Sequence, residues 1–184
     1  MDSLDDIVVF LKGQTSIMEL LAAVELLDLP DCWIGAGLIR NAVWDHLHSF
    51  PVEPHGSSDV DVVYYDQRHV TVDRDIAIEA QLFALFPKIQ WSVHNQARMH
   101  NRNGDEPYHN TADAIRCWSE TATAIAARTL GDNVAVIAPY GIDDLIGLVV
   151  RPTPAFVGKL DIYRKRVASK DWGQRWPRLT FIDV

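Results

Sequence analysis

The segment from Gly56 to Asp66 constrains the fold of this chain more than any other, because it attaches two acids to an evident strand. Val60 to Tyr65 is rich in β-branched and aromatic residues, which favour an extended strand. Asp59 and Asp61 stand at its start, and alternation along a strand predicts that both point to one face, about 6.6 Å apart along the backbone. Two carboxylates on a rigid element can bind Mg²⁺, which accepts a few carboxylates together with substrate phosphates. The alternative is a turn acid followed by a solvated strand acid.

A glycine corner precedes this strand by about 20 residues, a spacing that strengthens the interpretation of both features. The short apolar run at 32–34 leads into Gly35 and Gly37, and a helical pattern then continues to Leu47. The pattern predicts strand, turn and helix. Unpaired amides and the positive end of the helix dipole can accept a phosphate at such a corner. Arg40, one helical turn later, and Ser58, directly before the acidic pair, are assigned to the same nucleotide site; a tight turn that simply needs small residues is the alternative.

Composition limits the class of protein. The 184 residues suffice for one domain with a real core, so residues 1–184 are interpreted as a single domain. A formal net charge of -8 argues against a broad nucleic-acid surface, although it leaves room for a local nucleotide pocket. The acidic N-terminus is unlike a signal peptide, and no apolar run reaches the length of a membrane span. We therefore expect a cytoplasmic protein with no membrane association.

Periodicity predicts the remaining elements. Residues 1–30 have the pattern of two packing helices, and 76–86 that of another. Residues 90–99 alternate as a half-buried strand with a polar row, while 111–118 and 121–129 are predicted to be short helices and 134–138 a strand. Residues 155–184 are expected to form a basic amphipathic helix and a tail laid on the surface. That helix carries a basic stripe, interpreted as solvated or as a contact for an RNA or an anionic acceptor, which consists of Lys159, Arg164, Lys165 and Arg166.

The glycine corner and the Asp-x-Asp strand resemble those of the polymerase-beta nucleotidyltransferase superfamily. More narrowly, five ordered blocks look like those of a bacterial family of nucleotidyltransferase-like proteins, with the similarity running from about Trp33 to the C-terminus. The blocks are Gly35–Trp44, Ser58–Asp66, Asn95–His100, Pro139–Leu145 and Val150–Phe156.

The resemblance implies an α/β (α+β) fold, with a mixed sheet packed against helices and an N-terminal helical pair. It also implies transfer of a nucleoside monophosphate from an NTP to an acceptor, here an unknown small molecule or protein. Asp59 and Asp61 would be the catalytic metal ligands for Mg²⁺, or alternatively Mn²⁺, in a two-metal displacement. The corner at Gly35 and Gly37 would hold the triphosphate.

One departure from the superfamily pattern bears on activity. Its active members usually carry a third carboxylate on a neighbouring strand, but the candidate strand at 90–100 contains no acid. His94, Asn95 or Gln96 can occupy that position, or Asp113 can reach in from the following segment; Arg98, on the polar row, is a further candidate for binding nucleotide or acceptor. The alternative function is a non-catalytic nucleotide-binding or regulatory protein that keeps the fold.

Overall fold

A computed structural model of the chain describes residues 1–53 and 59–182. Its centre is a five-stranded sheet with the order β3-β2-β1-β4-β5. The pairing of β2 with β3 is parallel and the other pairings are antiparallel, so the sheet is mixed, as expected. The bounds are β1 Trp33–Gly35, β2 Val60–Tyr64, β3 Trp91–Asn95, β4 Ala126–Leu130 and β5 Asn133–Ile137. A second, two-stranded sheet joins β6 Val149–Val150 to β7 Thr180–Phe181.

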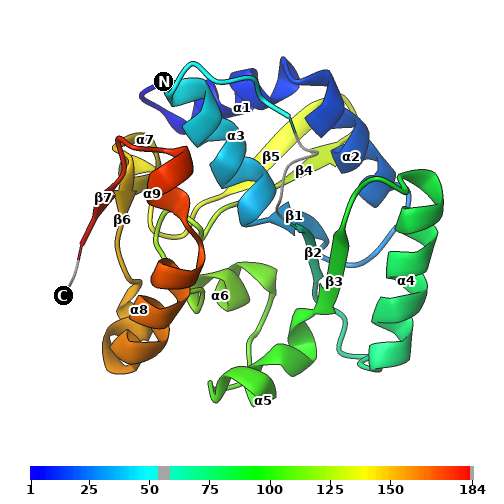
Figure 1. The fold of residues 1–184 in the computed structure, drawn as a ribbon. Coiled ribbons are helices and arrows are strands. Elements are labelled where there is room, and N and C mark those ends of the chain that lie inside the picture. The colour runs from blue at the N-terminus through cyan, green and yellow to red at the C-terminus, as the bar shows by residue number, and fades with distance from the viewer. Residues whose placement is uncertain (54–58, 183–184) are drawn as a thin grey trace.

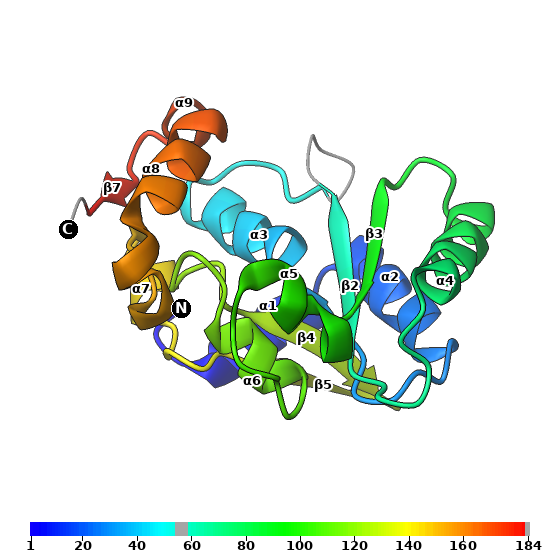
Figure 2. The ribbon, with the colours of Figure 1, turned by 90° about the horizontal axis from the view of Figure 1, so that it is seen from below.

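The predicted N-terminal helical pair is present as α1 Leu4–Lys12 and α2 Thr15–Glu25. A capping box starts α1: Asp6 N donates to Ser3 Oγ at 3.1 Å, and Ser3 N donates to Asp6 Oδ2 at 3.1 Å. The apolar faces of the two helices pack on β5 and β4 respectively. They cover one side of the sheet, whereas α5 Met99–Asn103 and α6 Thr111–Arg116 lie on the other (Figures 1 and 2).

No single helix of the described residues is long and apolar enough to cross a membrane. Helices α1 and α2 reach that length and composition only as a pair, which is bent by 93° at the break between them.

The strand, turn and helix predicted around the glycine corner are confirmed as β1 followed by α3 Gly37–Leu47. Ala36 forms the turn with a φ of 49°, in the left-handed region that costs a non-glycine residue free energy. Its N–H donates to Ile125 O at 2.9 Å, which ties the corner to the segment before β4.

Two predicted elements differ from the structure. The predicted helix at 121–129 is wrong, because Ala126–Leu130 is strand β4, paired with β1 and β5. The strand predicted at 90–99 ends at Asn95, where the Asn95 side chain accepts from Ala97 N at 3.0 Å. The chain then turns through η1 Gln96–Arg98 into α5. The remaining helices are α4 Val72–Leu85, α7 Asp143–Ile146, η2 Pro154–Lys159, α8 Leu160–Ser169 and α9 Trp172–Arg175.

The C-terminal tail, expected on the surface, belongs to the core. Trp172 and Trp176 are only 5% and 3% exposed, and both rings pack edge-on against Trp44 of α3. Buried Asp45 accepts a hydrogen bond from Trp176 Nε1 at 2.8 Å and pairs with Arg175 at 3.0 Å. The tryptophans therefore attach α9 to the body of the fold, beside α8 and α3 (Figure 1).

Candidate functional site

A cavity of about 520 Å³ lies where the β1–α3 corner, β2, the turn after β3, and α8 converge. Asp61 faces it from β2, and His94 and Gln96 face it from the end of β3 and the start of η1. One part of the lining is apolar, with Met99, Trp118, Phe156 and Ile162. Another is basic, with Arg102, Lys159 and Arg166. The cavity thus combines an acid, several cations and an apolar wall, as a site for a charged ligand with a hydrophobic part requires.

Asp61 occupies the centre of the sheet end that borders the cavity. In the strand register it pairs with Gly35 on β1 and with Ser92 on β3. Burial raises the pKa of Asp61, a hydrogen bond from Ser92 opposes that increase, and the negative charge of Asp59 adds to it. Asp59 itself is exposed, just before β2. Of the predicted acidic pair, Asp61 therefore lines the cavity, whereas Asp59 is exposed two residues before it and is not part of the lining.

The acidic pair supplies carboxylate oxygens, which are suitable ligands for a divalent cation. The negative charge of Asp59 raises the pKa of Asp61, and a bound cation would relieve this repulsion. Among the described residues, no group of three or more His, Cys, Asp or Glu side chains could hold a metal. A pair of carboxylates completed by oxygens of a phosphorylated substrate is nevertheless a donor set that suits Mg²⁺.

The glycine corner has a packing role that the sequence interpretation did not include. A Cβ on Gly35 would lie 2.4 Å from Trp118 Cη2, so the indole ring fills the space that a side chain would need. Ala36 lines the cavity, and buried Gly37 opens α3 beside it. The first amides of this eleven-residue helix accordingly lie at the edge of the cavity.

Arg40 lies behind the cavity wall instead of in it. Its side chain is 4% exposed, donates to Thr123 Oγ1 at 2.9 Å, and stacks 4.3 Å from the centre of the Trp172 ring. Burial lowers the pKa of Arg40 to about 10, and the charge of Glu120 opposes this. Arg40 therefore reaches the cavity only through Thr123, which lines it. Ser58, the other predicted nucleotide contact, lies outside the described residues.

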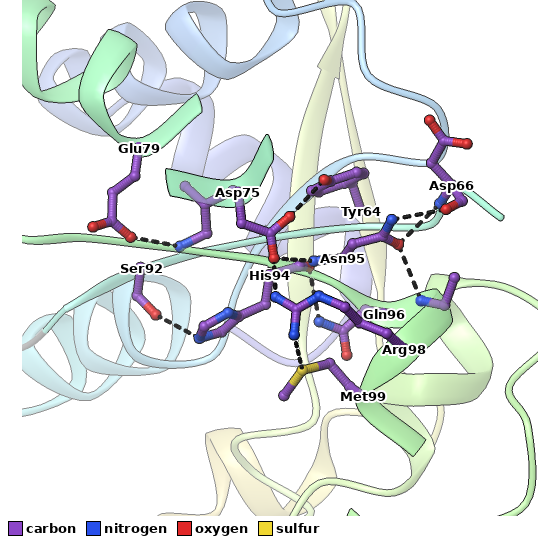
Figure 3. Close-up of polar contacts among 12 residues, drawn as sticks. Tyr64, Asp66, Asp75, Glu79, Ser92, His94, Asn95, Gln96, Arg98 and Met99 are labelled. Carbon is purple, nitrogen blue, oxygen red and sulfur yellow. Dashed lines mark hydrogen bonds and ion pairs between the residues drawn. The ribbon is translucent and has the colours of Figure 1, made fainter. Parts of the chain in front are cut away.

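The corner between β3 and η1 carries the predicted third-position candidates (Figure 3). His94 Nε2 lies 3.4 Å from Ser92 Oγ, while His94 Nδ1 is buried without a partner among the described residues. Gln96 Nε2 donates to His94 O at 3.0 Å. The Gln96 side chain is thus fixed to the backbone of His94, and the His94 ring contacts Ser92, the strand neighbour of Asp61.

Asn95 and Arg98 point into a separate buried network instead (Figure 3). Asn95 Nδ2 donates to Asp66 O at 2.7 Å, and Arg98 forms an ion pair with Asp75. Asp75 Oδ1 also accepts from Tyr64 Oη at 2.6 Å, and Asp75 Oδ2 accepts from Asn95 N at 3.1 Å. These contacts make Arg98 and Asn95 supports of the corner.

Asp113 is not part of the cavity lining either. Its carboxylate accepts from His109 N at 3.0 Å near the start of α6, which Asn110 caps through Asp113 N at 2.8 Å. The position on β3 beside Asp61 belongs to Ser92, which the sequence interpretation missed. Pairing the apolar alternation of β3 with that of β2 would have identified it, because Val60 aligns with Trp91 and Val62 with Val93.

Solved structures share this arrangement of elements. An NMR structure described as revealing a CCA-adding enzyme head domain superposes with a TM-score of 0.89 at 28% identity, covering 100% of this chain and 98% of that one. A Thermotoga maritima CCA-adding enzyme complexed with tRNA gives 0.56 at 13%, with 99% and 43% covered. A CCA-adding enzyme complexed with ATP gives 0.53 at 14%, with 98% and 42% covered. The chain spans less than half the length of the latter two enzymes.

The sheet, the helices and the acidic strand therefore define a polymerase-beta-like fold. The chain belongs to a nucleotidyltransferase family, whose model, described as "Nucleotidyltransferase", matches residues 22–181. None of the curated proteins matches the sequence.

Proposed function

We propose that the protein is a magnesium-dependent nucleotidyltransferase that transfers a nucleoside monophosphate from an NTP to an acceptor hydroxyl. The observation that carries the proposal is the position of Asp61, which faces the cavity next to Asp59 and opposite the glycine corner. Structures of CCA-adding enzymes with the same fold contain ATP or CTP, which supports an NTP as the donor.

Each part of the cavity has a distinct task in this reaction. Asp59 and Asp61 would hold Mg²⁺ or Mn²⁺, which neutralises phosphate charge and stabilises the attacking and leaving oxygens when bound. The amides at the start of α3 bind phosphate oxygens. The apolar wall at Trp118, Phe156 and Ile162 excludes water, so that the acceptor competes successfully for the α-phosphorus. The acceptor oxygen then bonds to that phosphorus and pyrophosphate departs.

Ser92 stands on β3 beside Asp61, where the resemblance to active nucleotidyltransferases suggests a third acid. This favours one competing function, a nucleotide-binding protein that does not catalyse transfer. His94 is the group of the cavity that can accept a proton from an acceptor hydroxyl in the place of that acid. The net charge of -8 favours a small molecule or a protein side chain over a long nucleic acid as the acceptor.

The first test is incubation of the protein with each of the four NTPs, labelled at the α-phosphate, and Mg²⁺. We expect pyrophosphate release or self-labelling with one of them, and loss of activity with EDTA. Asp61→Asn is expected to lower the rate at least roughly 100-fold, because it weakens the metal site, and Asp59→Asn to act similarly. Asp73→Asn, which removes an exposed acid of α4, is the matched control.

The outcomes separate the two functions. Transfer that persists in the Asp59→Asn and Asp61→Asn double variant contradicts the assignment of the metal ligands. Folded protein that binds Mg²⁺ and NTP, seen as an increase in melting temperature, but never releases pyrophosphate favours the binding function instead.

A further inference from the structure

Arg166 of α8 is a cation held at the cavity by a buried carboxylate. It lines the cavity, and its Nε donates to Glu120 Oε1 at 2.9 Å. The Glu120 side chain has no exposed surface, whereas that of Arg166 is 36% exposed. In such an ion pair the buried carboxylate is fixed in place and cannot move into solvent. It therefore orients the guanidinium at the cavity.

Glu120 itself is fixed by its surroundings. Its charge opposes the lowering of the pKa of Arg40, a second guanidinium, which is itself buried. Backbone hydrogen bonds hold its neighbours: Thr121 N donates to Arg151 O and Thr153 N donates to Ser119 O, both at 3.0 Å. Glu120 Oε2 has no hydrogen-bond partner among the described residues. Burial of this carboxylate therefore costs desolvation free energy, as expected when its charge has a function.

The position of Arg166 suits a negatively charged ligand near Asp61. Both side chains line the same cavity, Asp61 from β2 and Arg166 from α8. Lys159, another cation of the lining, is already paired with Asp105 at 2.8 Å and donates to Asn103 O at 3.0 Å. The contact to Glu120 uses Nε, and the guanidinium fork has further N–H donors that match two phosphate oxygens.

We propose that Arg166 binds the phosphates of the nucleotide across the cavity from Asp61, with Glu120 as its positioning residue. This inference rests on the proposed function for the presence of an NTP at the site. A triphosphate beside two carboxylates carries more negative charge than even two divalent ions neutralise. Arg166 provides additional positive charge from a separate element. Residues of α8 and β2 would therefore bind the phosphates from opposite sides.

Calorimetric titration of the folded protein with inorganic tripolyphosphate and Mg²⁺ measures this contact without a base or an acceptor. Arg166→Ala is expected to weaken binding roughly tenfold or more, because a charge-assisted hydrogen bond is lost. The affinity of Arg166→Lys is expected to fall between those of the native protein and Arg166→Ala, since an ammonium keeps the charge but lacks the guanidinium fork. Lys165→Ala removes the same charge from the exposed face of α8 and is expected to leave binding unchanged.

Glu120 is tested by a double-mutant cycle, with melting temperatures to establish folding. Glu120→Gln is expected to weaken tripolyphosphate binding in the native background and to have no effect beside Arg166→Ala, because it acts through that side chain. Glu120→Asp, which keeps the buried charge but withdraws it from Arg166, is expected to behave as Glu120→Gln does. An equal loss in both backgrounds would overturn the positioning role.

Failure of this inference is distinguishable from failure of the proposed function. Tripolyphosphate binding that is the same in Arg166→Ala and native protein overturns the phosphate contact, even if the native protein transfers nucleotides. Arg166-dependent binding with no transfer from any NTP supports the phosphate contact and counts against the enzyme. A native protein that binds neither tripolyphosphate nor NTP overturns both.

Discussion

Gly35 has no side chain, and the local structure depends on this absence. The sequence indicated a glycine corner suited to phosphate, and the corner is present, but the reason for this glycine also lies in the indole of Trp118. That contact joins residues far apart in the chain, so no local pattern reveals it. Arg40 illustrates the same limit, because its helical position was evident while its burial depends on Thr123 and Trp172.

Gly35→Ala is predicted to destabilise the protein by about 1–3 kcal/mol, because Cβ would meet Trp118 Cη2 at 2.4 Å and force the ring or the strand to move. For a chain of this size, each kcal/mol lowers the melting temperature by about 2–4 °C. Thermal unfolding followed by circular dichroism measures the change. Gly158→Ala is the control, because a Cβ there has nothing within 4 Å. A native melting temperature in Gly35→Ala would show that the packing is looser than described.

At the scale of elements, the strand, turn and helix at 33–47 and the acidic strand were predictable because their signals are local. The strand β4 was not. Its segment is rich in alanine, which suits a helix, yet pairing with β1 and β5 on its two sides selects the extended form. The β3–η1 corner was interpreted as continuous strand for a similar reason, since its stop depends on hydrogen bonds from Asn95 to a distant loop.

Asp66 links the end of β2 to α4 and makes the stability of this region depend on pH. Burial alone would raise the pKa of Asp66, but hydrogen bonds from His69, Arg74 and Arg68 N lower it below its usual range. The folded state therefore prefers the ionised carboxylate. The stabilisation is complete above the ordinary pKa of about 3.9 and is lost as the pH falls through the lower folded value.

Asp66→Asn is accordingly predicted to lower the free energy of unfolding by about 1–3 kcal/mol at pH 7. The difference from the native protein is expected to shrink below about pH 4, because the Asp66 carboxylate of the unfolded state then begins to accept protons while that of the folded state stays ionised. Urea unfolding at a series of pH values measures both quantities. A difference that stays constant down to pH 3 would contradict the role of the charge.

At the scale of the molecule, the cavity is assembled from segments along most of the chain. Sequence reasoning predicted the fold and singled out the acidic pair, because the two acids are close together in the sequence and lie in a strong motif. It interpreted Arg166 as part of a stripe that is solvated or touches an RNA or anionic acceptor, and it gave Glu120 no role, because their pairing joins α8 to the turn before β4. The sequence did not choose among the third-position candidates, and only the fold separates His94 and Gln96, which line the cavity, from Asn95 and Asp113, which do not.

Trp176 connects the end of the chain to the core, so Trp176→Ala is predicted to lower the free energy of unfolding by about 3–5 kcal/mol. The variant loses the edge-on contact with Trp44 and leaves Asp45 without its indole donor. Chemical denaturation measures the loss, and Phe181→Ala, at a side chain 40% exposed, is the control. An unchanged unfolding free energy would mean that α9 is merely attached to the surface.

Arg40 is covered by Trp172, which is synthesised much later, so this part of the fold cannot be completed early in synthesis. Asp61 and the glycine corner leave the ribosome long before α8 and α9, which supply Arg166 and the ring that covers Arg40. A nascent chain can pair β1 with β2 early, but the wall of the cavity opposite them does not yet exist. We therefore expect the proposed phosphate contact of Arg166 to form only after α8 has emerged.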